Sequence, residues 1–208
     1  MSTLRVAGSG KNITKLLSTV SSEVNDSTQG AILGADDATI RDLALEVTLV
    51  GGTGKSTGIF QGFSSGAATI QEVSIKISSS SSGTVQGIYA DTNVGTPISN
   101  VDIDVSGANA RGINGGSSVQ TIDNSSISVS GTFSQIAVAA NFNFMVVRNS
   151  VISSPEDAAD AFTTGALRVS DSIIDGLIDG TNTQCSFVFE SDGTAYSDSC
   201  QLPLHSIE

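Results

Sequence analysis

The sequence predicts an all-β fold in which short parallel strands wind into a solenoid of about six to seven coils. The main observation is a phrase that recurs six times: an aliphatic residue, any residue, a short acid or amide, and an aliphatic residue three positions later. The polar members of the phrase are Asp42, Glu72, Asn100, Asn124, Asn149 and Asp171. Steps of 22 to 30 residues between them are typical of a solenoid, in which each repeat is one coil.

A second phrase follows about half a coil after the first. Its clear copies, each with glycine before isoleucine or alanine, are 30–34, 58–62, 87–91 and 112–116, and weaker copies are 135–139 and 161–165. Each coil therefore holds at least two short strands with Gly, Ser, Asn or Thr at the bends. Alternation within the strands places one aliphatic row inward and one polar row outward, and coils about 4.8 Å apart then bury a continuous aliphatic column.

The recurring acid or amide has a structural interpretation. A short polar side chain at a tight bend bonds its own backbone and tolerates a left-handed conformation. Stacked in register, such side chains also bond one another along the column, as amide ladders do. The alternative is a column of carboxylates that binds a cation, but the mixture of Asp, Glu and Asn favours the ladder. Glu72, the longest side chain, fits the bend least well.

The two ends of the chain break the repeat. The stretch 12–25 is either the first coil or a short capping helix, and its β-branched residues favour a strand. Cys185 and Cys200 lie at equal distances from Asp192-Gly193, a strong two-residue hairpin signal. A hairpin there places the cysteines opposite each other within disulfide range. We expect one domain, with coils over 1–184 and a disulfide-closed hairpin cap and tail over 185–208.

Composition excludes several classes of function. A net charge of −12 disfavours nucleic acid and anionic membranes as partners, and no apolar run reaches the roughly 18 residues needed to span a membrane. The Gly-Lys-Ser of 51–57 lacks the first glycine of a phosphate loop. We expect no cofactor and no metal. A disulfide implies an oxidising compartment, hence export, and we expect a leader and an N-terminal region before Met1.

Three stretches carry a resemblance to a known family. They are 8–15, 30–43 and the closing cysteine hairpin. In this order they resemble bacterial exported proteins of the pectin-lyase-like superfamily. The resemblance implies a right-handed, single-stranded parallel β-helix. It implies no catalytic residues, because this fold hosts many functions.

An enzyme hypothesis must therefore use residues of this chain. Asp102 and Asp104 alternate with aliphatic residues, so both carboxylates are expected on one outward face, and Asp123 follows one coil later near Arg148. A polysaccharide lyase or glycoside hydrolase needs such carboxylates. The residue groups of the polygalacturonases and pectin methylesterases are absent, however, and the one histidine, His205, lies in the tail. A solvated acidic face is the simpler interpretation.

A binding hypothesis depends on one outward row. If Ile59, Ile88, Ile113 and Ile136 point inward, an outward row stacks in successive coils. That row comprises Phe60, Tyr89, Asn114, Ala137 and Thr163. Two aromatic rings beside amides suit a sugar, although both rings could instead pack under neighbouring loops. We predict a non-catalytic, exported, rigid structural or adhesive module that contacts polysaccharide on the Phe60, Tyr89 and Asn114 face, and self-association is a further expectation. The alternative is a carbohydrate-active enzyme that uses Asp102, Asp104 or Asp123.

Overall fold

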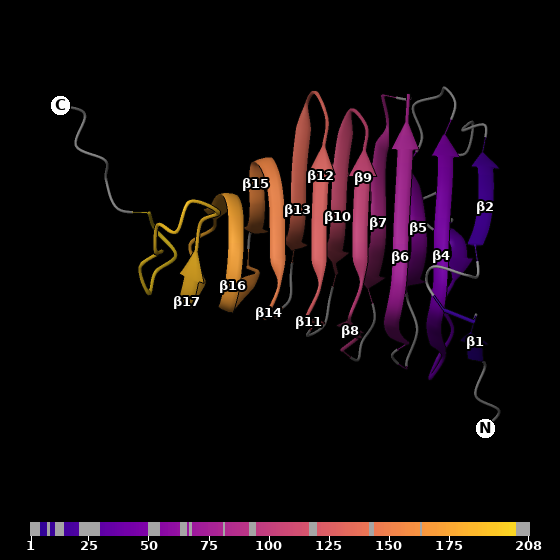
Figure 1. Cartoon of the computed structure of the whole chain (residues 1–208), viewed down its shortest axis with the longest axis horizontal. Coiled ribbons are helices and arrows are strands. Elements are labelled where there is room, and N and C mark those ends of the chain that lie inside the picture. The colour runs from indigo at the N-terminus through magenta and orange to yellow at the C-terminus, as the bar shows by residue number, and fades with distance from the viewer. Residues whose placement is uncertain are drawn as a thin grey trace.

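The chain forms a β-solenoid (Figure 1). The computed structural model describes residues 5–7, 9–10, 15–20, 30–49, 55–62, 66, 68–80, 82–91, 95–116, 120–141, 144–162 and 164–202. The strands in this part of the chain are β1 (Arg5–Ala7), β2 (Lys15–Val20), β3 (Gly30–Leu33), β4 (Thr39–Leu49), β5 (Ser56–Gly62), β6 (Thr69–Ser79), β7 (Thr84–Asp91), β8 (Pro97–Ser99), β9 (Asp102–Ser106), β10 (Asn109–Gly115), β11 (Gln120–Asp123), β12 (Ser126–Ser130), β13 (Ser134–Ala140), β14 (Phe144–Arg148), β15 (Val151–Ala161), β16 (Ala166–Asp179) and β17 (Thr183–Phe189). None of the described residues is helical, so this part of the chain contains no helix that could cross a membrane.

The strands pair in parallel and form three faces along the solenoid axis. The first face contains β1, the start of β4 and of β6, β8, β11, β14, the start of β16, and β17. The second contains β2, the rest of β4 and of β6, β9, β12, the start of β15 and the middle of β16. The third contains β3, β5, β7, β10, β13 and the ends of β15 and β16. This architecture confirms the predicted fold class, and the strand over Lys15–Val20 confirms the strand interpretation of the N-terminal stretch.

Each face contributes a stacked aliphatic column to the core. The first column is Ile40, Ile70, Ile98, Ile122, Val147 and Val169, and it ends at Cys185. The second is Leu45, Ile75, Ile103, Ile127, Ile152 and Ile174, and the third is Ile32, Ile59, Ile88, Ile113, Val138, Ala159 and Ile178. Most of these side chains are almost fully buried. Burial of one such aliphatic side chain contributes about 1.5 to 3 kcal/mol, so each coil stabilises its neighbours.

Glycines of the second phrase keep the third face close to the opposite wall. A Cβ added at Gly58 would lie 2.7 Å from the Gly87 carbonyl oxygen, and one added at Gly87 would lie 2.6 Å from the Gly112 oxygen. The same Cβ at Gly87 would lie 2.7 Å from Ile103 Cγ2, which belongs to the second face. The glycines are therefore required by close packing of the interior rather than by a bend.

The corner between the first and second faces is where the predicted ladder residues lie. All six of them, Asp42, Glu72, Asn100, Asn124, Asn149 and Asp171, have φ between 49° and 57°. The left-handed conformation predicted from their type is thus confirmed, and it includes Glu72. In the last coil Phe187 holds the same position with φ 54°. Among the described residues, one side-chain bond joins two members of the set, from the Asn124 amide to the Asn100 carbonyl oxygen.

Serines next to this corner form a hydrogen-bonded ladder of their own. Ser125, Ser150 and Ser172 are 6%, 2% and 3% exposed. The Ser150 hydroxyl accepts the Ser125 N–H at 3.1 Å, and the Ser172 hydroxyl accepts the Ser150 N–H at 3.1 Å. Each hydroxyl donates to a carbonyl two residues earlier in its own coil, at 2.7 to 2.8 Å. In the late coils these serines add inter-coil side-chain bonds to the backbone bonds of the corner and to the predicted amide bond between Asn124 and Asn100.

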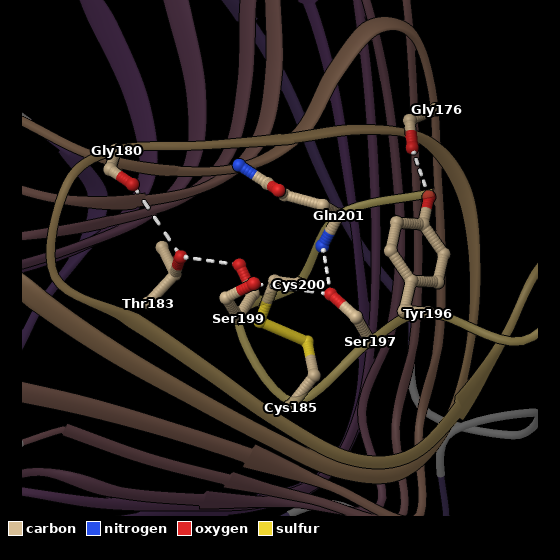
Figure 2. The surroundings of a disulfide bond; sticks show 9 residues. All are labelled: Gly176, Gly180, Thr183, Cys185, Tyr196, Ser197, Ser199, Cys200 and Gln201. Atoms are coloured by element: carbon tan, nitrogen blue, oxygen red, sulfur yellow. Dashed lines mark hydrogen bonds between the residues drawn. A yellow bond between two sulfur atoms is a disulfide. The ribbon is translucent and has the colours of Figure 1, made fainter. Parts of the chain in front are cut away.

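The C-terminal end is closed by a disulfide between Cys185 and Cys200, with Cα atoms 5.0 Å apart (Figure 2). The predicted disulfide is confirmed. The returning segment binds the outer edge of β17, where Tyr196 N–H donates to Val188 O at 3.0 Å and Cys185 N–H donates to Asp198 O at 2.9 Å. The Tyr196 hydroxyl donates to Gly176 O at 2.7 Å.

The closing segment differs from the predicted hairpin in its register and its start. A two-residue turn at Asp192-Gly193 would place Phe189 opposite Tyr196, in the register that also places Cys185 opposite Cys200. The antiparallel bridge instead joins Phe189 and Ala195, one residue out of that register. The Glu190 N–H donates to Thr194 O at 2.8 Å, so the loop has three residues rather than two, and an Asp192 carboxylate oxygen accepts the Thr194 N–H at 2.8 Å within it. Cys185 itself lies on β17, which pairs in parallel with β16. The last coil thus extends past the boundary predicted at residue 184, and the cap begins after Phe189.

Candidate functional site

The predicted aromatic platform on the third face is packed rather than open. Phe60 and Tyr89 lie in neighbouring coils with ring centroids 5.2 Å apart and planes at 10°. Phe60 is only 6% exposed, and its ring lies where a side chain at Gly62 would be. A sugar platform needs an exposed ring face, and stacking uses the facing sides of these two rings. The Tyr89 hydroxyl donates to Asp91 at 3.0 Å, and burial, with the Asp91 carboxylate as a smaller cause, raises the pKa of Tyr89 to about 12.

Asn114 is likewise occupied by the protein. Its amide nitrogen donates to Gln86 Oε1 at 2.6 Å, and its carbonyl oxygen accepts from Asn141 Nδ2 at 2.5 Å. The side chain is 5% exposed. Because both ends of the amide bond other amides of the third face, Asn114 joins coils together.

The register predicted for the row fails after Asn114. Asn114 pairs with Ala139 and Ile113 with Val138, so Ile136 does not continue the inward column. Ala137 belongs to the buried core, where it stacks in the next coil on the small residue Gly112. Steric demand explains the difference, since the position next to the opposite wall accepts only glycine or alanine. Thr163, the last residue of the predicted row, lies outside the described residues, as does His205.

The three candidate catalytic aspartates are divided between two faces. Asp102 and Asp104 are exposed on β9 of the second face, and Lys76 Nζ lies 3.9 Å from Asp104 Oδ2. Asp123 ends β11 on the first face, where it lies 3.6 Å from Arg148 and accepts the Asn149 amide at 2.9 Å. The shared outward face of the first two residues and the contact of Asp123 with Arg148 are as predicted. The corner at Asn124 separates the two groups, and Asp123 is engaged in holding that corner.

A charged cluster on the third face was not found from the sequence. Asp160 is 7% exposed, and burial, with Asp157 and Asp179 as further causes, raises its pKa to about 6 although Arg111 opposes the rise. Burial also raises the pKa of Asp157, assisted by Asp179. Burial lowers the pKa of Arg111, and Asp160 opposes that shift.

The register explains how this cluster forms. Asp160 lies between Ala139 and Asp179, and Asp157 lies beside Ile136, so residues from three coils meet on one surface. The Arg111 guanidinium carbon is 5.8 Å from the centre of the Phe162 ring. Among the described residues, no group of three acids, cysteines or histidines has a geometry that could hold a metal.

A groove at the bend from the second to the third face is a candidate for ligand binding. It has a volume of about 470 Å3 and crosses three successive coils. Its hydroxyl-bearing lining residues are Ser79, Ser80, Ser106, Ser130 and Thr132, and glycine and alanine complete it. The next residue, Phe133, is 71% exposed, and its N–H donates to Ala108 O at 2.9 Å beside the groove. We call this feature the bend groove.

Sequence reasoning missed the bend groove, although a signal was present. Ser106-Gly107-Ala108 and Ser130-Gly131-Thr132 are similar bends one coil apart, and the second is followed by an aromatic residue. A periodic hydroxyl at a bend next to an exposed ring would have indicated a surface for a polar, repeating ligand.

Comparison with models of protein families, with curated proteins and with solved structures found no match. The structure thus establishes a parallel β-solenoid with a C-terminal disulfide, and the disulfide is consistent with an oxidising compartment.

Proposed function

We propose that this protein is an exported, non-catalytic β-solenoid that acts as a rigid adhesive module and binds a neutral polysaccharide in the bend groove. The observation that carries the proposal is the groove itself, with hydroxyls from three stacked coils beside the exposed Phe133. Its volume lies in the range of small-ligand sites, which is about 300 to 1,000 Å3.

The chemistry of the groove favours an uncharged sugar. None of the eight residues that line it carries an ionisable group. Hydroxyls donate and accept hydrogen bonds, as sugar hydroxyls do, and an exposed aromatic ring packs on the apolar face of a sugar. The coils repeat at a constant spacing, so a polymer that runs along the axis meets the same groups again. A chain of net charge −12 would also repel a strongly acidic polymer.

Rigidity and export have separate support. Stacked aliphatic columns make a rod in which each coil is held by two neighbours. A buried disulfide forms and persists in oxidising compartments. The similarity of the sequence motifs to exported pectin-lyase-like proteins agrees with this assignment.

The test of binding uses variants matched for exposure. Affinity electrophoresis is run with a neutral polysaccharide that retards the wild-type protein. Phe133→Ala should bind this polysaccharide about tenfold more weakly, because ring stacking is lost. Phe187→Ala is the control, since Phe187 is 74% exposed and lies on the last strand, away from the bend groove. The double variant Ser130→Ala/Thr132→Ala should also weaken binding, whereas Ser126→Ala/Ser128→Ala on the adjoining second face should not. Equal retention of all variants would refute the assignment of the groove.

A second candidate function, polysaccharide cleavage, is favoured by Asp160. A buried carboxyl with a pKa of about 6 near two other carboxyls and an arginine is suited to proton transfer. A panel of acidic and neutral polysaccharides, with and without Ca²⁺, should be assayed for unsaturated products by ultraviolet absorbance and for new reducing ends. Product formation that disappears in Asp160→Asn would establish this second function and exclude the non-catalytic proposal.

A further inference from the structure

A second concave site lies at the C-terminal end, where β16 turns into β17 beside the start of β14. It has a volume of about 300 Å3, at the lower end of the range for small-ligand pockets. Its walls include Phe144, Arg168 and Gln184 from three successive coils, together with Thr181 and Asn182 from the connecting bend. We call it the Arg168 pocket. Its size suits one small ring rather than a polymer.

Two contacts fix the guanidinium of Arg168. Its central carbon lies 4.8 Å from the centre of the Phe144 ring, and its Nε donates to Gln184 Oε1 at 2.9 Å. Stacking and this hydrogen bond restrict the plane of the group. Both Nη atoms remain to act as donors. One N–H bond of each points in the same direction, because the guanidinium group is planar. The side chain is therefore oriented in advance for a ligand that accepts two hydrogen bonds.

Arg168 differs in its partners from Arg41, Arg111 and Arg148, the other arginines whose side chains the structure describes. Arg41 lies 2.7 Å from Asp42, Arg148 lies 3.6 Å from Asp123, and Arg111 faces Asp160. No carboxylate pairs with Arg168 among the residues that the structure describes. The chain has 21 acidic and only 9 basic side chains, so an arginine held on a ring without an acid is a distinctive feature.

We infer that the Arg168 pocket binds the carboxylate of a small polyhydroxylated acid through the two Nη atoms of Arg168. A planar carboxylate matches the guanidinium in a bidentate pair. A phosphate is less suited, because one arginine with no described second cation in the lining would face a higher charge. Thr181, Asn182 and Gln184 offer hydroxyl and amide groups for the rest of such a ligand. This inference does not depend on the bend groove, which lies at another part of the surface.

The experiment is an NMR titration of the full chain with sodium glucuronate, in which the Arg168 Nε–H and Gln184 amide signals are followed. Glucuronate should shift both signals in a saturable way, and glucose, which lacks the carboxylate, should not. Acetate should bind more weakly than glucuronate, because it lacks hydroxyls. Raising the salt concentration should weaken glucuronate binding, since the pocket is exposed.

Variants separate the site from an unspecific charge effect. Arg168→Gln should lower the affinity for glucuronate about 10- to 100-fold, and Arg168→Lys should recover only part of it, because lysine lacks the fork and the ring stacking. Phe144→Leu should lower affinity while the charge is kept. Arg148→Gln is the matched control, since Arg148 lies one coil earlier with an acid partner.

Melting curves show whether each variant is folded. The inference fails if wild-type protein shows no shift with glucuronate, if a folded Arg168→Gln variant binds it unchanged, or if inorganic phosphate binds more tightly than glucuronate. Phe133→Ala should leave glucuronate binding intact, so that a failure of the groove proposal and a failure of this one are distinguishable.

Discussion

The corner between the first and second faces is built differently in the early and the late coils. In the early coils the residue after the left-handed position is Leu43, Val73 or Val101, and each is buried against the core. In the late coils that residue is Ser125, Ser150 or Ser172, and each bonds a backbone N–H of the preceding coil. The left-handed backbone is the same throughout.

The difference shows that the shape of the coil is set by the left-handed residue and not by the filling of the corner. An aliphatic side chain stabilises the corner by apolar burial, and a serine does so by satisfying buried polar backbone groups. Buried polar side chains occur in both halves of the solenoid, with Gln61 and Gln86 in early coils and Asp160 in a late one. The late coils also hold the disulfide and the Tyr196 bond that close the end.

The largest effect is expected from an aliphatic corner residue. Leu43→Ala removes a side chain that is 1% exposed and should lower the free energy of unfolding by about 3 kcal/mol, because it leaves a cavity. Urea unfolding measures this loss. Leu17→Ala is the control, since Leu17 is 71% exposed and its truncation should change stability by less than about 0.5 kcal/mol. A loss below about 1 kcal/mol for Leu43→Ala would show that burial does not hold the early corner.

Removal of the disulfide should have a similar or slightly smaller effect on the late end. Cys185→Ala/Cys200→Ala opens a loop with a sequence separation of 15, and the expected loss is about 3 kcal/mol in the chain-entropy model. Thermal melting under oxidising conditions measures it. The wild-type protein in reductant should melt at a lower temperature as well, whereas the double variant should not respond to reductant. If neither treatment lowers the melting temperature, the hydrogen bonds of the returning segment close the end by themselves.

A serine of the late corner should contribute less than an early aliphatic residue. Ser150→Ala leaves the buried Ser125 N–H without its acceptor and should cost about 2 kcal/mol. Ser128→Ala on the exposed second face is the matched control and should be nearly neutral. Equal stability of Ser150→Ala and wild type would indicate that water replaces the hydroxyl. Hydrogen exchange at the Ser125 amide would then be fast in the variant.

The buried Asp160 should make stability depend on pH. Its folded pKa of about 6 lies above its ordinary value, so the folded state binds the extra proton. Stability is then greatest below the unfolded pKa of about 4 and falls as pH rises towards 6. Asp160→Asn should be about 1 to 2 kcal/mol more stable than wild type at pH 8, after a discount for solvent screening, and nearly equal at pH 4. Urea unfolding across this range, with Asp104→Asn as an exposed control, measures the difference. A parallel pH profile for Asp160→Asn and wild type would contradict the assignment.

The smallest effect concerns the left-handed position itself. Phe187 adopts φ 54° although aromatic residues disfavour this region. Phe187→Asn should therefore raise the free energy of unfolding by about 0.5 to 1 kcal/mol, and urea unfolding can detect this gain. Asn124→Phe is the reverse change at the middle one of these corners, and it should lower stability by a similar amount or more. A loss of stability in Phe187→Asn would mean that the exposed ring makes a favourable contact.

The fold was predictable because it depends on local, repeated chemistry. The left-handed positions follow from an Asp, Asn or Glu that recurs every 22 to 30 residues, and the columns follow from the aliphatic residues on either side of them. Phe187 carries no such signal, so the corner of the last coil was invisible in the sequence. Glu72 shows that position in the coil outweighs side-chain length.

The candidate sites were less predictable because they depend on side-chain burial and on register between coils. Phe60 and Tyr89 were correctly placed in one row, but their stacking on each other decides whether a ring is exposed. The pairing of Ile113 with Val138 is set by how close the opposite wall lies, which periodicity does not reveal. The Arg168 pocket joins residues of three coils and a bend. No short sequence motif contains the residues of this pocket, because they are far apart in the chain.

The closed C-terminal edge also constrains how such a rod can change its length during evolution. The returning segment occupies the hydrogen-bonding edge of β17, so no coil can be appended there without displacing it. Coils between the two ends, by contrast, present equivalent edges to both neighbours. Duplication or loss of a whole internal coil would leave those edges matched. Related rods of different length should therefore differ by internal coils and keep the same final strand, disulfide and tyrosine.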